Sequence, residues 1–169
     1  KDCTKEIRVK FTARGLTREE VMMLDIIANN DWKRGIYFSS PGGSDVSKTL
    51  YASKCIRQNG MAFEFSPLAV DPRTELFGGY RFNADKMYDN LINKYSYGAM
   101  NNPDVLTDYY ARRHTSQYRM HFLALAEYYV NMTLVDPSKS KEYKEKAKAL
   151  IHKSIDAMPA SIVIDHGEP

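Results

Sequence analysis

The segment GGSDVSKT, residues 42–49, comes nearest to a nucleotide-binding motif in this chain. It follows a predicted strand and precedes a predicted helix, as a phosphate-binding P-loop does. A P-loop has the pattern GxxxxGK[ST], because its second glycine lets backbone N–H groups surround the phosphates. Here Ser47 stands in the place of that glycine, before Lys48 and Thr49. A degenerate P-loop nucleotide-binding domain is therefore retained only as a second alternative function, and we expect no cofactor.

Acids, bases and thiols are the other candidates for chemistry. No histidine accompanies a serine or cysteine in a recognisable nucleophile setting. Asp85 and Asp89 lie four residues apart, a spacing that serves acid–base chemistry or cation binding, but first-turn acids are explained by the helix dipole. The same holds for Asp104 and Asp108. The two cysteines form no CxxC pair and are expected to be ordinary thiols. We predict no catalytic residue and no metal ligand. The histidines are His114, His121, His152 and His166, and the cysteines are Cys3 and Cys55.

Aromatic side chains form the one binding surface that we predict. Large aromatic rings are most often core residues, but exposed ones can stack on a sugar or pack against a peptide. We predict a partner surface or sugar-stacking surface at five positions. They are Trp32, Tyr95, Tyr97, Tyr109 and Tyr110.

Composition describes an ordinary globular chain. Its 169 residues are 43% hydrophobic and 27% charged, and its net charge of +3 is spread along the length. No basic block is dense enough for a nucleic-acid surface, so we expect no nucleic-acid partner. No run approaches the ~20 apolar residues of a membrane span, and no signal peptide is evident. The first residues already resemble mid-domain sequence, so we expect a piece excised from a longer protein.

The first half alternates strand and helix patterns. Thr17 and Glu20 have the spacing of a helix-starting capping box. This alternation predicts an α+β protein whose residues 1–82 form a small three- to four-stranded α/β layer with parallel crossovers. The expected strands are Glu6–Phe11, Gly35–Ser39, Met61–Phe65 and a short one at Tyr80–Phe82, and the expected helices are Thr17–Asn29 and Ser47–Gln58, the second closed by Asn59-Gly60.

The second half, residues 83–169, has helical periodicity. Its last two helices form a hairpin that resembles a tetratricopeptide repeat. Because one repeat cannot bury its own apolar face, we expect the hairpin to pack on the α/β layer. A standalone tetratricopeptide-type protein-interaction module is therefore the first alternative function. The expected helices are Asn83–Tyr95, Tyr109–Leu134 and Glu142–Met158.

Three blocks carry a resemblance to a known family. They are LDIIANNDWKRGIYFSS (Leu24–Ser40), NADKMYDNLINKYSYGAMNNPDV (Asn83–Val105) and RRHTSQYRMHFLALAEYYV (Arg112–Val130). Together they resemble the C-terminal soluble tail of a bacteroidete family of multi-pass membrane proteins of unknown function. The membrane part of that family is similar to protein O-mannosyltransferases, glycosyltransferases of the GT-C type. Where the family has Arg-Pro before its Ile-Tyr-Phe strand, this chain has Arg34-Gly35.

The resemblance implies a non-catalytic periplasmic accessory domain of a membrane-embedded glycosyltransferase-like protein. Such a domain would aid acceptor binding or assembly. Its implied partners are the membrane-embedded portion of its own parent chain and a protein or glycan acceptor. Its implied location is the periplasmic face of the inner membrane. The family's presumed catalytic acids lie in membrane-proximal loops, so none transfers to this chain.

Overall fold

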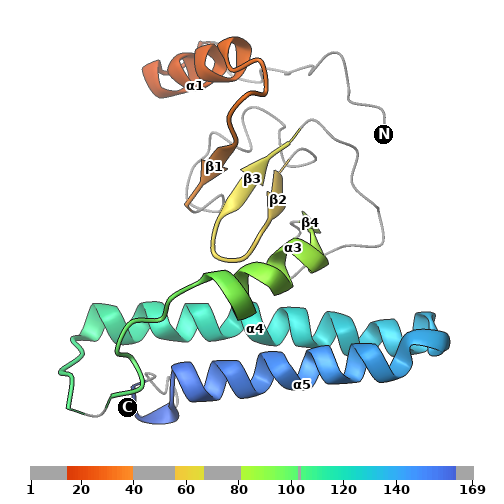
Figure 1. The fold of residues 1–169 in the computed structure, drawn as a ribbon. Helices are drawn as coiled ribbons and strands as arrows, with labels where there is room; N and C mark the ends of the chain where they lie inside the picture. Colours follow the sequence, from red (N-terminus) through yellow and green to blue (C-terminus); the bar gives the residue numbers. More distant parts are fainter. Residues whose placement is uncertain (1–14, 40–55, 67–80, 103, 163–169) are drawn as a thin grey trace. The chain divides into compact units, whose positions relative to one another are not determined.

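The computed structural model describes residues 15–39, 56–66, 81–102 and 104–162 (Figure 1). The chain divides into two compact units, residues 1–83 and residues 84–169. The predicted strand Glu6–Phe11, the segment 42–49 and both cysteines lie outside the described residues. The fold class is α+β with a mostly helical second unit, as predicted.

In its described residues, the first unit has the helix α1 and a four-stranded sheet with the order β1-β3-β2-β4. β1 and β2 both pair antiparallel with β3, and only β2 and β4 run parallel. A sheet of three to four strands is confirmed among the described residues, but the predicted parallel arrangement is wrong for two of the three strand pairs. The elements are α1 (Arg18–Asn29), β1 (Ile36–Phe38), β2 (Ile56–Gln58), β3 (Phe63–Phe65) and β4 (Arg81–Phe82).

A tight hairpin between β2 and β3 explains the antiparallel arrangement. The Asn59 N–H donates to the Ala62 carbonyl at 2.9 Å, and Gly60 has a φ of 106°, which glycine adopts without a Cβ clash. We predicted that Asn59-Gly60 closes a helix ending at Gln58. That prediction is wrong for residues 56–58, which form a strand with Ile56 and Gln58 on its buried side. A left-handed glycine serves a hairpin turn as readily as a helix end.

Helix α1 begins with the predicted capping box. The Thr17 N–H donates to Glu20 Oε2 at 2.7 Å, and the Glu20 N–H donates to Thr17 Oγ1 at 3.3 Å. Both interactions satisfy N–H groups that a helix start leaves without partners. The core of this unit is Ile56 and Phe65. The residues packed against that pair are Met23, Leu24, Ile27, Ile36, Phe38 and Phe63.

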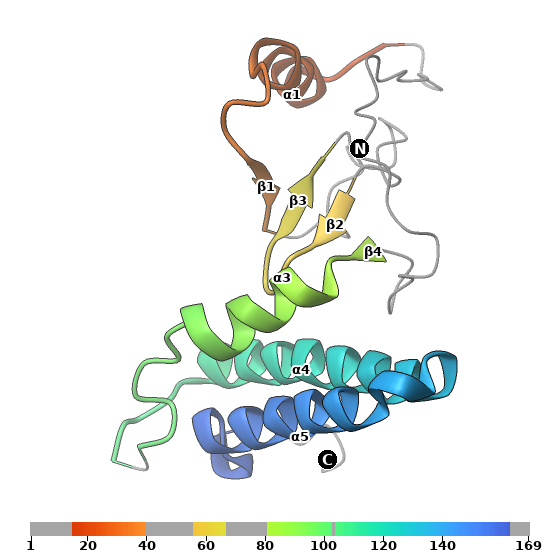
Figure 2. The ribbon, with the colours of Figure 1, turned by 45° about the vertical axis from the view of Figure 1, so that its right-hand side comes forward.

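The second unit is an antiparallel helical hairpin with a shorter helical segment lying against it (Figures 1 and 2). Asp108 caps its longest helix by accepting the Ala111 N–H at 2.7 Å, and the helix ends at Val135 before Asp136-Pro137. The largest fully buried side chains of the second unit include Phe122, Leu150 and Tyr129. The elements are α3 (Ala84–Asp89), the π-helix η3 (Asn90–Lys94), α4 (Tyr109–Val135), the 3₁₀ turn η4 (Pro137–Lys139), α5 (Ser140–Ala157) and the 3₁₀ turn η5 (Ala160–Ile162).

Candidate functional site

The five predicted aromatic residues are distributed over both units. Trp32 lies in the first unit, in the turn after α1, where Asp31 and Trp32 both have positive φ angles of 50° and 55°. The Asn30 amide supports this turn by donating to the Arg34 carbonyl at 2.7 Å. The Trp32 ring stacks on Phe65 with centroids 5.8 Å apart. One ring face of Trp32 is thus used in packing.

Tyr95 and Tyr97 line a polar pocket of about 360 Å³ in the second unit. The π-helix η3 ends where the Tyr95 N–H donates to the Asn90 carbonyl at 2.9 Å, and the chain then turns away from the helix. Gly98 continues this turn with a φ of 59°. The other lining residues are Ser96, Asn101, Lys153, Asp156 and Ala157.

A hydrogen bond and a ring contact hold the Tyr97 side chain in place in the polar pocket. Its hydroxyl donates to the Leu91 carbonyl at 2.7 Å, and its ring lies 5.8 Å from that of Phe122. Burial, followed by the proximity of Tyr95, raises the pKa of Tyr97 well above its ordinary value, so its hydroxyl stays protonated. Lys153 Nζ lies 5.7 Å from the centre of the same ring, a cation–π distance.

The remaining lining groups can both donate and accept hydrogen bonds. Lys153 contributes donors, Asp156 contributes acceptors, and the Asn101 amide provides both. The two charged residues come from consecutive turns of α5, which positions them on one edge of the pocket. This arrangement suits a small polar ligand rich in hydroxyl or amide groups.

Tyr109 and Tyr110 occupy the first turn of α4 and do not line the polar pocket. Their rings meet edge to face with centroids 5.6 Å apart, and their side chains are 61% and 67% exposed. The structure therefore brings only Tyr95 and Tyr97 together in a cavity.

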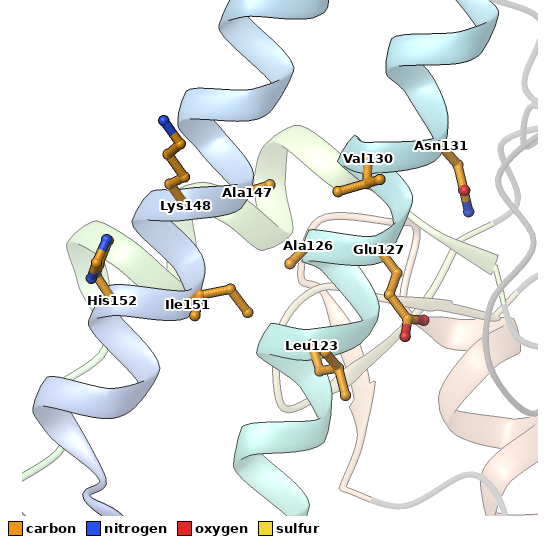
Figure 3. Close-up of a pocket in the computed structure, with 9 residues that line it drawn as sticks. All are labelled: Leu123, Ala126, Glu127, Val130, Asn131, Ala147, Lys148, Ile151 and His152. Atoms are coloured by element: carbon orange, nitrogen blue, oxygen red, sulfur yellow. The ribbon is translucent and has the colours of Figure 1, made fainter.

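A second, mostly apolar groove of about 500 Å³ runs between α4 and α5 (Figure 3). Leu123, Val130 and Ile151 border it, and Ala126 and Ala147 form its floor. This groove was not predicted from the sequence. The signal was a second set of apolar residues along α4, spaced three, seven and four positions apart beside the buried series. They are Met120, Leu123, Val130 and Leu134.

Three of the four paired carboxylates cap a helix or contact a lysine. Asp108 caps α4, while Asp89 accepts from the Asn93 amide at 2.9 Å and pairs with Lys94 at 2.6 Å. The hydrogen bond from Asn93, followed by that from Lys94, lowers the pKa of Asp89. Asp85 lies in the first turn of α3, 3.9 Å from Lys146. Within the described ranges, no group of three His, Cys, Asp or Glu residues is arranged to hold a metal ion.

The histidines have separate surroundings. His114 stacks on Tyr118 with ring centroids 6.4 Å apart, and His152 borders the apolar groove. Burial lowers the pKa of His121, which favours its neutral form. His166 lies outside the described residues.

Comparison with known protein families gives a match over the first half of the chain. The family model of TMEM260-associated domain 2 matches residues 1–86, just over half of the chain. No curated protein and no solved structure is significantly similar to this chain. In the part of the chain that the structure describes, no helix has both the length and the apolar character needed to cross a bilayer.

Proposed function

Because this chain belongs to the TMEM260-associated domain 2 family, we propose that it is a non-catalytic accessory domain of a membrane-embedded, glycosyltransferase-like protein. The family match supports a domain of a TMEM260-like membrane protein. The resemblance to bacteroidete relatives of protein O-mannosyltransferases supports the finer assignment. In this proposal the domain lies at the periplasmic face of the inner membrane and helps its parent chain to bind a protein or glycan acceptor.

The polar pocket carries the acceptor-binding part of the proposal. It contains two of the five predicted aromatic residues and has charges of both signs. A volume of about 360 Å³ lies within the range of small-ligand pockets, roughly 300–1,000 Å³. A sugar unit or a short hydroxyl-bearing peptide presents both hydrogen-bond donors and acceptors. Lys153, Asn101 and Asp156 supply the complementary groups.

Replacing either charged residue of the pocket should weaken acceptor binding. We expect Asp156→Asn and Lys153→Gln each to raise the dissociation constant about tenfold, because a hydrogen bond to a charged group contributes about 1.5–3 kcal/mol. The measurement is an NMR titration of ¹⁵N-labelled protein with methyl hexosides and with a serine- and threonine-containing peptide. Shifts should concentrate on residues 95–101 and on the end of α5.

Lys144→Gln is the matched control, since Lys144 lies on α5 outside the pocket lining. It should leave the titration unchanged. If neither probe moves the signals of Tyr95–Asn101, the pocket does not bind an acceptor. A parent gene without membrane-spanning segments would contradict the assignment to a membrane-embedded protein.

Nucleotide binding is tested separately. A ligand at 100 times its dissociation constant stabilises the folded state by about 2.7 kcal/mol. The P-loop alternative therefore predicts a clear rise in melting temperature with ATP and magnesium. We expect no rise, because Ser47 replaces the glycine that phosphate binding requires. A stabilisation that disappears in Lys48→Ala would instead establish the nucleotide site.

A further inference from the structure

Two side chains of opposite charge line the polar pocket from one turn of α5. Lys153 and Asp156 lie three positions apart, and Ala157 belongs to the same part of the lining. Residues at this spacing are neighbours on a helix surface. The pocket therefore offers a cationic group and an anionic group within one helical turn.

Both of these charges are available to a ligand. Among the described residues, Lys153 and Asp156 have no ion-pair partner, and they do not pair with each other. Lys148 and Glu145 of the same helix also lie three positions apart, and they do pair, at 3.3 Å. The charges that line the pocket thus differ from that pair in having no opposite charge beside them.

The Lys153 ammonium is held in place before a ligand arrives. Its Nζ lies 5.7 Å from the centre of the Tyr97 ring, and that ring is itself fixed by Phe122 and by the hydrogen bond to the Leu91 carbonyl. The Lys153 side chain is also partly buried. Because a side chain that is already ordered loses less conformational entropy on binding, Lys153 is a better contact than a fully exposed lysine.

The same contacts make Tyr97 a poor surface for stacking on a sugar. Its hydroxyl already donates to the Leu91 carbonyl, and its ring contacts both Phe122 and the Lys153 ammonium. Stacking requires an aromatic face that is open to the ligand. Recognition in this pocket therefore falls to its polar and charged groups.

Asn101 adds a contact that suits a peptide backbone. Its side-chain amide makes no hydrogen bond among the described residues, so its oxygen and its NH₂ group can both be used. A peptide group presents one N–H donor and one C=O acceptor, which match that amide. The pocket thus has complementary groups for a peptide backbone and for side chains of both charges.

We propose that the polar pocket binds a peptide segment in which side chains of opposite charge lie close to the hydroxyl-bearing residue. This segment is the acceptor of the proposed function, on which the inference rests, and it narrows the acceptor from a protein or glycan to a peptide. A carboxylate of the peptide meets Lys153, and a cationic side chain meets Asp156. Such charge-assisted hydrogen bonds are roughly twice as strong as neutral ones. A segment with charges of one sign would bring like charges together at one of the two residues.

Matched peptides test the role of charge. The probes are the acetylated and amidated peptides Lys-Ser-Glu, Glu-Ser-Lys and Gln-Ser-Gln, together with a methyl hexoside, each titrated into the ¹⁵N-labelled full chain. We expect the better of the two charged peptides to bind about tenfold more tightly than the neutral one, because it forms two exposed ion pairs. At about 0.5 M salt this ratio should fall below about threefold, since salt screens exposed charges.

Removing one charge from the pocket should remove about half of this preference. In Lys153→Gln and in Asp156→Asn, the ratio of the two dissociation constants should fall from about ten to about three. Lys144→Gln, on α5 outside the pocket lining, should keep a ratio of about ten. Because all three residues are at least partly exposed, circular dichroism should show unchanged helix content.

The outcomes that overturn the inference separate it from the proposed function. Equal binding of the charged and neutral peptides, with shifts at residues 95–101, would remove the requirement for charge and leave acceptor binding intact. Shifts caused by the methyl hexoside alone would assign the pocket to a glycan, which also agrees with the proposed function. A preference that persists in Lys153→Gln and Asp156→Asn would place the charge contacts outside the pocket. No shift from any probe would overturn the inference and acceptor binding together.

Discussion

Replacing Phe122 by alanine is expected to lower the free energy of unfolding by about 3–5 kcal/mol, the largest effect that we expect in the second unit. Phe122 lies on α4 with no exposed surface, and its ring centre is 5.8 Å from that of Tyr97. Removing the ring leaves a cavity and takes away the support of Tyr97 within the polar pocket. Urea denaturation followed by circular dichroism at the helical band measures the change.

Two other variants define how specific this effect is. Phe122→Leu keeps most of the buried volume and should cost less than about 1.5 kcal/mol if its neighbours repack. Tyr110→Ala, on the same helix but exposed, should stay within about 0.5 kcal/mol of the unmodified chain. Equal effects for Tyr110→Ala and Phe122→Ala would contradict the packing described for α4.

The second large effect is expected in the first unit, where Phe65→Ala should also cost about 3–5 kcal/mol. Phe65 is 3% exposed and contacts Trp32 at 5.8 Å and Phe38 at 6.4 Å between ring centres. Trp32 is the only tryptophan of the chain, so its fluorescence reports directly on this cluster. In Phe65→Ala we expect the Trp32 emission to shift to the red before any denaturant is added. The midpoint of the urea unfolding transition that Trp32 reports should move to a lower urea concentration.

Tyr37→Ala is the control for the sheet. Tyr37 is exposed on β1, and its hydroxyl donates to Glu64 Oε1 at 3.4 Å across the strand pair. Cross-strand pairs contribute about 0.2–1 kcal/mol. Tyr37→Ala should therefore lower the free energy of unfolding several times less than Phe65→Ala does. Unchanged emission of Trp32 in Phe65→Ala would show that the stacked arrangement does not form in solution.

Local signals predicted α1, α4 and α5 to within two residues of their observed bounds. The capping box at Thr17 fixed the start of α1, and the break at Asp136-Pro137 fixed the end of α4. Both signals depend on residues within a few positions of each other. The hairpin of α4 and α5 followed from periodicity alone, because helices of 27 and 18 residues repeat their pattern many times.

The sheet was harder to predict because strand pairing is not local. Residues 56–58 were assigned to a helix, since three residues are too few to distinguish a period of two from one of 3.6. Gly60 was correctly predicted to have a positive φ, yet the same conformation ends a helix and reverses a hairpin. Which of the two occurs depends on β3, which supplies the partner strand.

The candidate sites were predicted in part. Tyr95 and Tyr97 stood out as aromatic residues, but Lys153 and Asp156 lie more than 50 positions away and carry no motif. The groove escaped notice because the apolar residues of α4 were read as one core-facing stripe. Separating two stripes on one helix requires knowing which side the rest of the unit covers.

The π-helix η3 determines the direction in which the chain leaves the helix toward Tyr97. Its hydrogen bond from Tyr95 to Asn90 spans five residues, one more than in an α-helix. Each residue turns a helix by about 100°, so one extra residue redirects everything that follows it. A chain shortened by a single position within Asn90–Lys94 would continue as a regular helix and would carry the Tyr97 side chain away from Phe122. The direction of the side chains that residues 95–101 contribute to the polar pocket thus depends on the five-residue hydrogen bond that ends η3.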